Sequence, residues 1–277
     1  MSQGKRLRPI LVIVSAEAVG GRREDVMSLA LAFELFHTAT LVHDDIIDQD
    51  DLRRDLPALH KRWSVNDAIL AGDALIALSI GLASQYGEEV LKVVSESALQ
   101  ICDGEYLETS LARNLTNEEI YYRVVQRKSA SLFKAAAHCG ALVGGGKPAE
   151  VLSLGGFGQS FGIAYQLRDD LLDLESSLES IPGEGKIPLT LPLIRLRETS
   201  GGDQLEGLLD SLVAGHRGSA ETVKAILRMM KEYGVDNYCR NSFRQHLQGS
   251  IDCLSPLRES RSKRLLVKMA KSLENTV

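Results

Sequence analysis

The sequence predicts an all-α protein, built as a single-domain helical bundle across residues 1–277. Apolar residues recur at helical spacing through several long segments, whereas alternating β-branched runs bounded by turns are almost absent. Capping and breaking residues fall between these segments, and no long linker or internal repeat divides the chain. In a bundle of this size we expect several central helices to be buried on most of their faces.

Five long segments carry the helical period, with several shorter ones toward the C-terminus. These segments are Arg23–Asp48, Ser64–Gly87, Gly87–Asn114, Thr116–Gly146 and Pro148–Ser176. Ser64 is placed to cap the second segment, and Thr116 begins a T-x-x-E capping box with Glu119. The glycine run Gly144–Gly146, followed by a proline, is expected to end the fourth segment.

Composition limits the compartment and the partners. The chain is 44% hydrophobic and 25% charged, which is ordinary for a globular protein, and its net charge of −5 argues against nucleic acid as a partner. The four cysteines are far apart and form no C-x-x-C, so we expect reduced thiols in a cytoplasmic protein. Pro9 opens the first apolar run without a clear cleavage site, and no stretch approaches the ~20 unbroken apolar residues of a membrane span.

Two acidic clusters repeat one spacing, D-D-x-x-D, each at the end of an apolar segment. They are Asp44, Asp45 and Asp48, and Asp169, Asp170 and Asp173. On a helix the first and third carboxylates share a face, and three carboxylates within one turn repel each other unless a cation compensates. One such cluster is usually a solvated surface, but two matching clusters favour a ligand. Oxygen-only ligands suit Mg²⁺ together with phosphate oxygens, and the spacing is not that of a calcium loop. We predict several Mg²⁺ ions around one diphosphate.

Basic residues accompany the first acidic cluster. The stretches "GKRLRP" (Gly4–Pro9) and "LRRDLPALH" (Leu52–His60) supply Lys5, Arg8, Arg53 and Arg54. The arginine guanidinium suits bidentate phosphate recognition, and lysine acts as a point charge. Any one of these cations alone is commonly a surface residue. Their combination with the aspartate clusters predicts phosphate binding.

Six blocks in order resemble the trans-isoprenyl diphosphate synthases, or polyprenyl synthetases. The blocks are "GKRLRP", "ELFHTATLVHDDIIDQDDLRR", "AILAGDALIA", "RKSASLF", "GIAYQLRDDLLD" and "LTLPLI". The resemblance implies a bundle of the isoprenoid synthase type around a central apolar cavity, working as a homodimer. It also implies the reaction, a 1′-4 condensation of isopentenyl diphosphate onto an allylic diphosphate, and a transient membrane contact for release of the product.

The resemblance also assigns roles to individual residues. It implies that the six aspartates bind Mg²⁺ and the allylic diphosphate, with the catalytic Lys128 and with Arg53 and Gln166 completing that site. Isopentenyl diphosphate would be held by Lys5, Arg8, His37 and Arg54. A lone His on an apolar helix is more often a core residue, but His37 lies seven residues before Asp44 on the same face, which favours a ligand role.

Product length is expected to depend on the first acidic helix. In the family, bulky aromatics one turn before the first D-D-x-x-D close the tunnel after short products. Here Ala39 and Thr40 occupy those positions, and Phe36 lies a further turn away as a deeper floor or as a core residue. We expect a product longer than geranylgeranyl diphosphate. The alternative is geranylgeranyl diphosphate itself, with the floor supplied by another helix.

The sequence departs from the family pattern in three places. Only Met1–Gln3 precede the G-K-x-x-R block, where the family has a helix. Asp55 replaces a glycine, and Ser129 replaces a threonine but keeps the hydroxyl for substrate binding. The segment Glu179–Leu189, a predicted loop, is short and contains a single lysine of the family's two, Lys186, expected to contact the allylic substrate.

Two other functions remain open from the sequence. A subunit of a heteromeric prenyl synthase is favoured by the short loop and opposed by the presence of both acidic motifs. A terpene cyclase or head-to-head synthase would need no isopentenyl diphosphate site, so the basic blocks oppose it.

Overall fold

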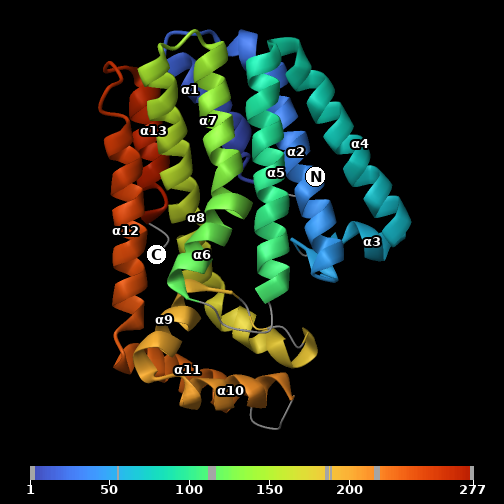
Figure 1. The fold of residues 1–277 in the computed structure, drawn as a ribbon, viewed down its shortest axis with the longest axis vertical. Coiled ribbons are helices and arrows are strands. Elements are labelled where there is room, and N and C mark those ends of the chain that lie inside the picture. Colours follow the sequence, from blue (N-terminus) through green and yellow to red (C-terminus); the bar gives the residue numbers. More distant parts are fainter. Residues whose placement is uncertain are drawn as a thin grey trace. The chain divides into compact units, whose positions relative to one another are not determined.

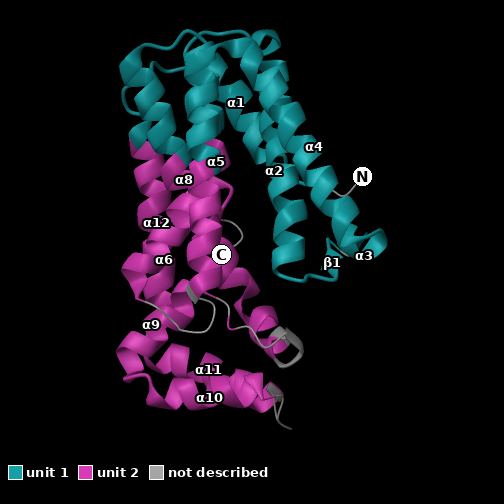
Figure 2. Cartoon of the chain, turned by 45° about the vertical axis from the view of Figure 1, so that its right-hand side comes forward, with its two compact units in different colours: residues 1–98, 132–158, 253–266 teal, residues 99–131, 159–252, 267–277 magenta. Residues whose placement is uncertain are grey.

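The computed structural model describes residues 4–54, 56–111, 117–184, 187, 189–214 and 219–274, and these are almost entirely helical (Figure 1). Within these residues the strands are β1 (Leu52–Arg53) and β2 (Leu56–Pro57), a short antiparallel pair. The prediction of an all-α protein is therefore confirmed. The chain divides into two compact units, coloured in Figure 2: unit 1 (residues 1–98, 132–158 and 253–266) and unit 2 (residues 99–131, 159–252 and 267–277).

Unit 1 contains the N-terminal helices and parts of several later ones. Its complete elements are α1 (Leu7–Ala18), the 3₁₀ turn Arg23–Val26, α2 (Met27–Ile47), α3 (Leu59–Arg62), α4 (Val65–Ala83) and the 3₁₀ turn Ser84–Tyr86. It shares with unit 2 the helices α5 (Glu88–Leu111), α7 (Ser131–Val143), α8 (Pro148–Glu184) and α13 (Arg261–Lys271). Helix α2 packs along α4 and α1.

One glycine allows α2 and α4 to approach closely. A Cβ at Gly72 of α4 would lie 2.2 Å from Nε2 of His43 on α2, so no larger residue fits there without moving the ring. His43 directly precedes Asp44. The packing of α4 therefore fixes the turn of α2 that carries the first acidic cluster.

Unit 2 contains the remaining helices. They are α6 (Glu118–Val125), the π-helical turn Gln126–Ala130, α9 (Leu191–Ser200), α10 (Asp203–Val213), α11 (Ser219–Glu232) and α12 (Val235–Cys253), of which only Cys253 belongs to unit 1, and most of them are labelled in Figure 1. Apolar side chains at helical spacing form its core. In α8, Leu174, Leu178 and Ile181 recur at i, i+4 and i+7 and are all buried.

Several predicted helix starts and ends agree with the structure. The first segment begins as a 3₁₀ turn, and α2 ends with Asp48 as its C-cap. The hydroxyl of Ser64 caps α4 by accepting the backbone N–H of Asp67 at 3.1 Å, as predicted. Helix α6 is capped by Asn117, whose side chain accepts the N–H of Ile120 at 2.9 Å, while Thr116 lies outside the described residues.

Two predictions about local structure were wrong. The expected loop Glu179–Leu189 is helical at its start, because α8 continues to Glu184 and buries Ile181. The fourth predicted segment, Thr116–Gly146, is not one regular helix. A π-helical turn separates α6 from α7, and this turn contains Lys128.

Two helical stretches, Arg23–Ile47 and Val65–Tyr86, are long and apolar enough to cross a membrane by length and composition alone. The first is 39% buried within the fold and the second 22%. Core helices of folded domains pass the same test, so this feature by itself is weak evidence for a membrane span.

Candidate active site

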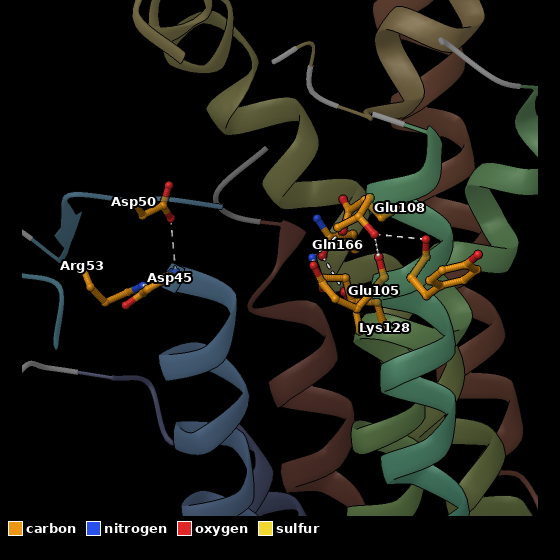
Figure 3. A network of polar contacts seen from close by, with 10 residues as sticks. Asp45, Asp50, Arg53, Glu105, Glu108, Lys128 and Gln166 are labelled. Atoms are coloured by element: carbon orange, nitrogen blue, oxygen red, sulfur yellow. Dashed lines mark hydrogen bonds and ion pairs between the residues drawn. The ribbon is translucent and has the colours of Figure 1, made fainter. Parts of the chain in front are cut away.

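The first acidic cluster lies in the last turn of α2, in unit 1. The backbone N–H of Asp48 donates to the carbonyl of Asp44 at 2.8 Å, so these two residues lie one helical turn apart, and both are half-buried. Asp45 is buried, and Arg53 of β1 donates through Nε to its Oδ1 at 2.6 Å (Figure 3). Arg53 also reaches Asp50 at 3.4 Å. The middle aspartate is thus held by an arginine of the same sequence block.

Cations gather around His37 in the same unit. A Cβ at Gly4 would lie 2.8 Å from a guanidinium nitrogen of Arg54, which places the start of the first basic block against the second. Burial, and after it the charges of Arg8, Arg54, Arg53 and Arg6, lower the pKa of His37 from 6.5 to about 2. The imidazole is therefore neutral at physiological pH. It can donate one hydrogen bond to an anion while the arginines supply the charge.

Arg8 is fixed by an aromatic ring. Its guanidinium carbon lies 4.2 Å from the centre of the Phe133 ring, a cation–π contact that orients the planar group. Lys5, the other predicted residue of this block, is exposed just before α1. The structure thus brings Arg8, His37 and Arg54 into one cationic region, as expected for an anion site.

The three residues proposed to govern product length follow α2 away from Asp44. Ala39 is completely buried, Phe36 is buried, and Thr40 is half-buried, with its hydroxyl donating to the carbonyl of His37 at 2.9 Å. Ala39 and Thr40 lie on α2 in the turn before Asp44. Their role in setting product length stays a prediction.

The π-helical turn in unit 2 displays Lys128 and Ser129. Such turns interrupt helices frequently at functional sites, because they shift side chains out of the regular register. A Cβ at Gly104 of α5 would lie 2.5 Å from the backbone nitrogen of Lys128, so only glycine allows α5 to approach the turn this closely. The close approach places two glutamates of α5 beside the lysine.

Glu105 and Glu108 both form ion pairs with Lys128 (Figure 3). Nζ of Lys128 lies 2.7 Å from Oε2 of Glu105, whose carboxylate is largely buried, and it also donates to Oε2 of Glu108. These glutamates were not among the site residues predicted from the sequence. Their i, i+3 spacing next to Gly104 puts both glutamates on one face of α5, and this was the only indication in the sequence. The spacing does not reveal their partner, because Lys128 lies on a different element.

The second acidic cluster is tied to the same turn. The Ser129 hydroxyl donates to Oε1 of Gln166 at 2.8 Å, and Nε2 of Gln166 donates to Oδ1 of Asp170 at 3.0 Å. Oδ2 of Asp170 accepts the Tyr121 hydroxyl at 2.6 Å and the Leu191 backbone N–H at 3.1 Å. Burial raises the pKa of Asp170 to about 6, even though these three hydrogen bonds favour its ionised form.

The outer aspartates of this cluster have a different environment. Asp169 is half-buried and accepts a hydrogen bond from Arg168 at 2.8 Å, whereas Asp173 is exposed one turn further along α8. Lys186, the predicted contact to the allylic substrate, lies outside the described residues, as does Asp55. The prediction that the two aspartate clusters face each other stays a prediction.

Among the described residues, no three His, Cys, Asp or Glu side chains converge as a ready-made metal site. This is compatible with Mg²⁺, which takes one or two carboxylates and completes its shell with phosphate oxygens and water. The available donors around both clusters are carboxylate oxygens, which fit a hard cation. An open pocket of about 530 Å³ at the turn between α9 and α10 is lined by none of the predicted site residues, and Arg197 is paired there with Glu206 at 3.0 Å.

The sequence is similar to those of a known protein family and of named enzymes. The sequence model of the polyprenyl synthetase family matches residues 1–230. The chain is 35% identical, over 96% of its length and 85% of the relative's, to a short chain isoprenyl diphosphate synthase of Methanothermobacter thermautotrophicus. It is 33% identical, over 97% of its length and 84% of the relative's, to an all-trans-nonaprenyl-diphosphate synthase of Rhodobacter capsulatus.

The fold has the same relatives. The crystal structure of a polyprenyl synthase from Caulobacter crescentus, complexed with calcium and isoprenyl diphosphate, superposes with a TM-score of 0.88 at 26% identity, covering 100% of this chain and 86% of that one. The all-α fold is that of a polyprenyl synthase, and the Caulobacter protein holds a divalent metal ion together with its isoprenyl diphosphate. The chain belongs to the polyprenyl synthetase family, whose members named here are trans-prenyl diphosphate synthases that elongate an isoprenoid chain.

Proposed function

We propose that this enzyme adds isopentenyl diphosphate units to an allylic diphosphate and releases a product longer than geranylgeranyl diphosphate. The relatives' products range from short chains to nonaprenyl diphosphate, so the family alone leaves the length open. The proposal of a longer product rests on the two small residues Ala39 and Thr40. Small side chains stand where a bulky ring would obstruct a growing chain.

Isopentenyl diphosphate is the proposed ligand of the cationic region in unit 1. The guanidinium groups of Arg8 and Arg54 bind the diphosphate oxygens, and neutral His37 adds a hydrogen bond. Lys5 contributes a further charge at the edge of this region. Holding the nucleophilic double bond in a fixed position removes much of the entropic barrier to its attack on the allylic carbon.

The allylic diphosphate is the proposed ligand of the acidic clusters together with Lys128. Asp44, Asp48, Asp169 and Asp173 are the carboxylates we propose to hold Mg²⁺, because Asp45 and Asp170 are the buried members of the two clusters. Mg²⁺ held by these carboxylates would neutralise the charge that develops on the diphosphate when the allylic C–O bond breaks. Lys128 stabilises the same charge, and Gln166 and Ser129 keep the π turn and α8 in register beside it.

The decisive experiment is an assay of the purified chain alone. It would receive Mg²⁺, labelled isopentenyl diphosphate and farnesyl diphosphate, and the products would be separated by chain length. We expect labelled products longer than geranylgeranyl diphosphate. Accumulation of geranylgeranyl diphosphate alone would contradict the proposed length. Product without consumption of isopentenyl diphosphate would indicate a cyclase, and no product from the chain alone would favour a subunit of a heteromeric synthase.

A homodimer is the proposed assembly. Helix α4 exposes an apolar stripe at i, i+4, i+7, i+8 and i+11 that consists of Leu70, Ala74, Ala77, Leu78 and Gly81. Small residues alternating with leucine allow two helices to pack closely. Asp67 and Asp73 are exposed on the same helix and would be costly in a lipid environment, so we assign the stripe to a second copy of the chain.

A further inference from the structure

Asp170 lies at the centre of the second acidic motif, yet its contacts are those of a buried structural carboxylate. Only 6% of the residue is exposed. Its Oδ1 accepts Nε2 of Gln166, one turn earlier on α8, at 3.0 Å. Its Oδ2 accepts two donors from other helices, the Tyr121 hydroxyl of α6 and the Leu191 backbone N–H of α9. Both carboxylate oxygens are therefore occupied by protein donors.

The contact with Leu191 replaces a missing helix cap. Leu191 is the first residue of α9, and the first N–H groups of any helix lack partners within it. Thr190 occupies the N-cap position, but its side chain makes no capping hydrogen bond, and its buried Oγ1 has no partner among the residues that the structure describes. Asp170, 21 residues earlier in the chain, accepts the Leu191 N–H at 3.1 Å instead. A carboxylate at a helix N-terminus also interacts favourably with the helix dipole.

Tyr121 holds Asp170 in the position that the cap requires. The tyrosine is 1% exposed, and its hydroxyl lies 2.6 Å from the oxygen that accepts the Leu191 N–H. Desolvation and the charge of Asp170 raise the pKa of Tyr121 well above its usual value, so the phenol remains a donor. Helices α6, α8 and α9 thus meet at one carboxylate.

We propose that Asp170 is the N-terminal cap of α9 supplied from α8, and that Tyr121 is a positioning residue acting through it. This tether fixes the turn of α8 that presents Asp169 and Asp173. The statement about ligand binding rests on the proposed function, in which those two aspartates hold Mg²⁺ and the allylic diphosphate. The tether itself depends only on the hydrogen bonds among Tyr121, Asp170 and Leu191.

Conservative variants separate a tether from a metal ligand. In Asp170→Asn the amide oxygen can still accept the Tyr121 hydroxyl and the Leu191 N–H. The new amide NH₂ can donate to Gln166 if that side chain turns over, and the turned Gln166 can donate to Ser129. The tether therefore survives without a carboxylate. Tyr121→Phe keeps the ring in the core and removes only the hydroxyl that positions Asp170.

The test combines two measurements that do not require turnover. Backbone hydrogen exchange of the peptide around residues 191–196 reports the cap of α9, and calorimetric titration with inorganic pyrophosphate in MgCl₂ reports ligand binding. We expect Tyr121→Phe to accelerate exchange at the start of α9 by about tenfold, the equivalent of one lost hydrogen bond. We also expect it to weaken magnesium–pyrophosphate binding several-fold, whereas Asp170→Asn changes both by less than Tyr121→Phe does.

Tyr238→Phe is the matched control. Tyr238 also donates its hydroxyl to a carboxylate in unit 2, that of Glu118, at 2.6 Å, and the phenylalanine keeps the ring that stacks on Arg195 of α9 at 4.1 Å. We expect this variant to lower the melting temperature without altering exchange at α9 or pyrophosphate binding. An equal effect of Tyr121→Phe and Tyr238→Phe on binding would reduce Tyr121 to a structural residue and overturn the proposal.

The remaining outcomes distinguish the tether from the proposed function. If Asp170→Asn weakens magnesium–pyrophosphate binding as strongly as Asp169→Asn, then Asp170 is a metal ligand and the proposal is wrong. If the unmodified protein binds no magnesium–pyrophosphate, the proposed function fails. The exchange of the α9 amides in Tyr121→Phe still decides for or against the tether in that case.

Discussion

Arg53 donates through Nε to Oδ1 of Asp45 at 2.6 Å, joining β1 to the last turn of α2. The side chain of Asp45 is only 5% exposed, so removing its arginine leaves a buried acceptor without its cation. We expect Arg53→Met to destabilise the protein by about 2 kcal/mol. Adding Asp45→Asn should recover part of that loss. Chemical denaturation of both single variants and the double variant measures the coupling, and strictly additive effects would contradict the assigned pairing.

Variants of the ion pair between Lys128 and Glu105 distinguish an effect on protein stability from an effect on substrate binding. Lys128→Met leaves the largely buried carboxylate of Glu105 without its lysine, and we expect a loss of about 3 kcal/mol. The double variant Lys128→Met with Glu105→Gln should recover much of this stability. Its KM for the allylic diphosphate should stay raised, because the lysine charge is still missing. Recovery of both quantities would show that Lys128 has no role in substrate binding.

The lowered pKa of His37 should make the free energy of unfolding depend on pH. Burial, together with the charges of Arg8 and Arg54, lowers its pKa from 6.5 to about 2 in the folded protein. As the pH falls below 6.5, the unfolded chain binds a proton that the folded protein does not, so stability is lost. The expected contribution is about 2 kcal/mol between pH 7.5 and pH 5.

The variant His37→Asn isolates this contribution. Its free energy of unfolding should fall less steeply over the same pH range than that of the unmodified protein. The difference between the two curves removes the effects of His138 and His246, whose pKa values burial also lowers. Parallel curves would mean that His37 is protonated in the folded state as readily as in the unfolded one.

Ala39→Phe tests the proposed tunnel wall. If Ala39 borders space for a growing chain, the ring fits and the product becomes shorter while the melting temperature changes little. The matched control is Ala32→Phe, also buried on α2, where the backbone carbonyl accepts the Ser79 hydroxyl of α4 at 2.9 Å. Overpacking there should cost about 1–3 kcal/mol without changing product length. Unchanged products from a folded Ala39→Phe enzyme would exclude Ala39 from the wall.

Leu70→Glu tests the proposed dimer. A charge at the first position of the α4 stripe should convert a dimer into a monomer in sedimentation velocity experiments. Leu152→Glu is a suitable control, because Leu152 is equally exposed, at 69% against 66% for Leu70, but lies on α8. A sedimentation coefficient that does not change in Leu70→Glu would remove α4 from the interface.

The local features of the site were available from the sequence. The D-D-x-x-D spacing places Asp44 one turn before Asp48, the helical period predicts α2 and α4, and Ser64 caps α4 as its position indicates. These features depend on neighbours within a few residues, so the backbone geometry of a helix decides them. The class of reaction followed from the order of six short blocks along the chain.

The tertiary structure decided which of the predicted residues have protein partners. The six aspartates are indistinguishable by type and spacing, yet Asp170 is engaged by Tyr121, 49 residues away, and caps a helix that begins at Leu191. Glu105 forms its ion pair with Lys128 only because Gly104 lets α5 approach the π turn closely. Hydrogen bonds and ion pairs of this kind depend on distances between elements that are remote in the chain, and such distances are set by how the helices pack.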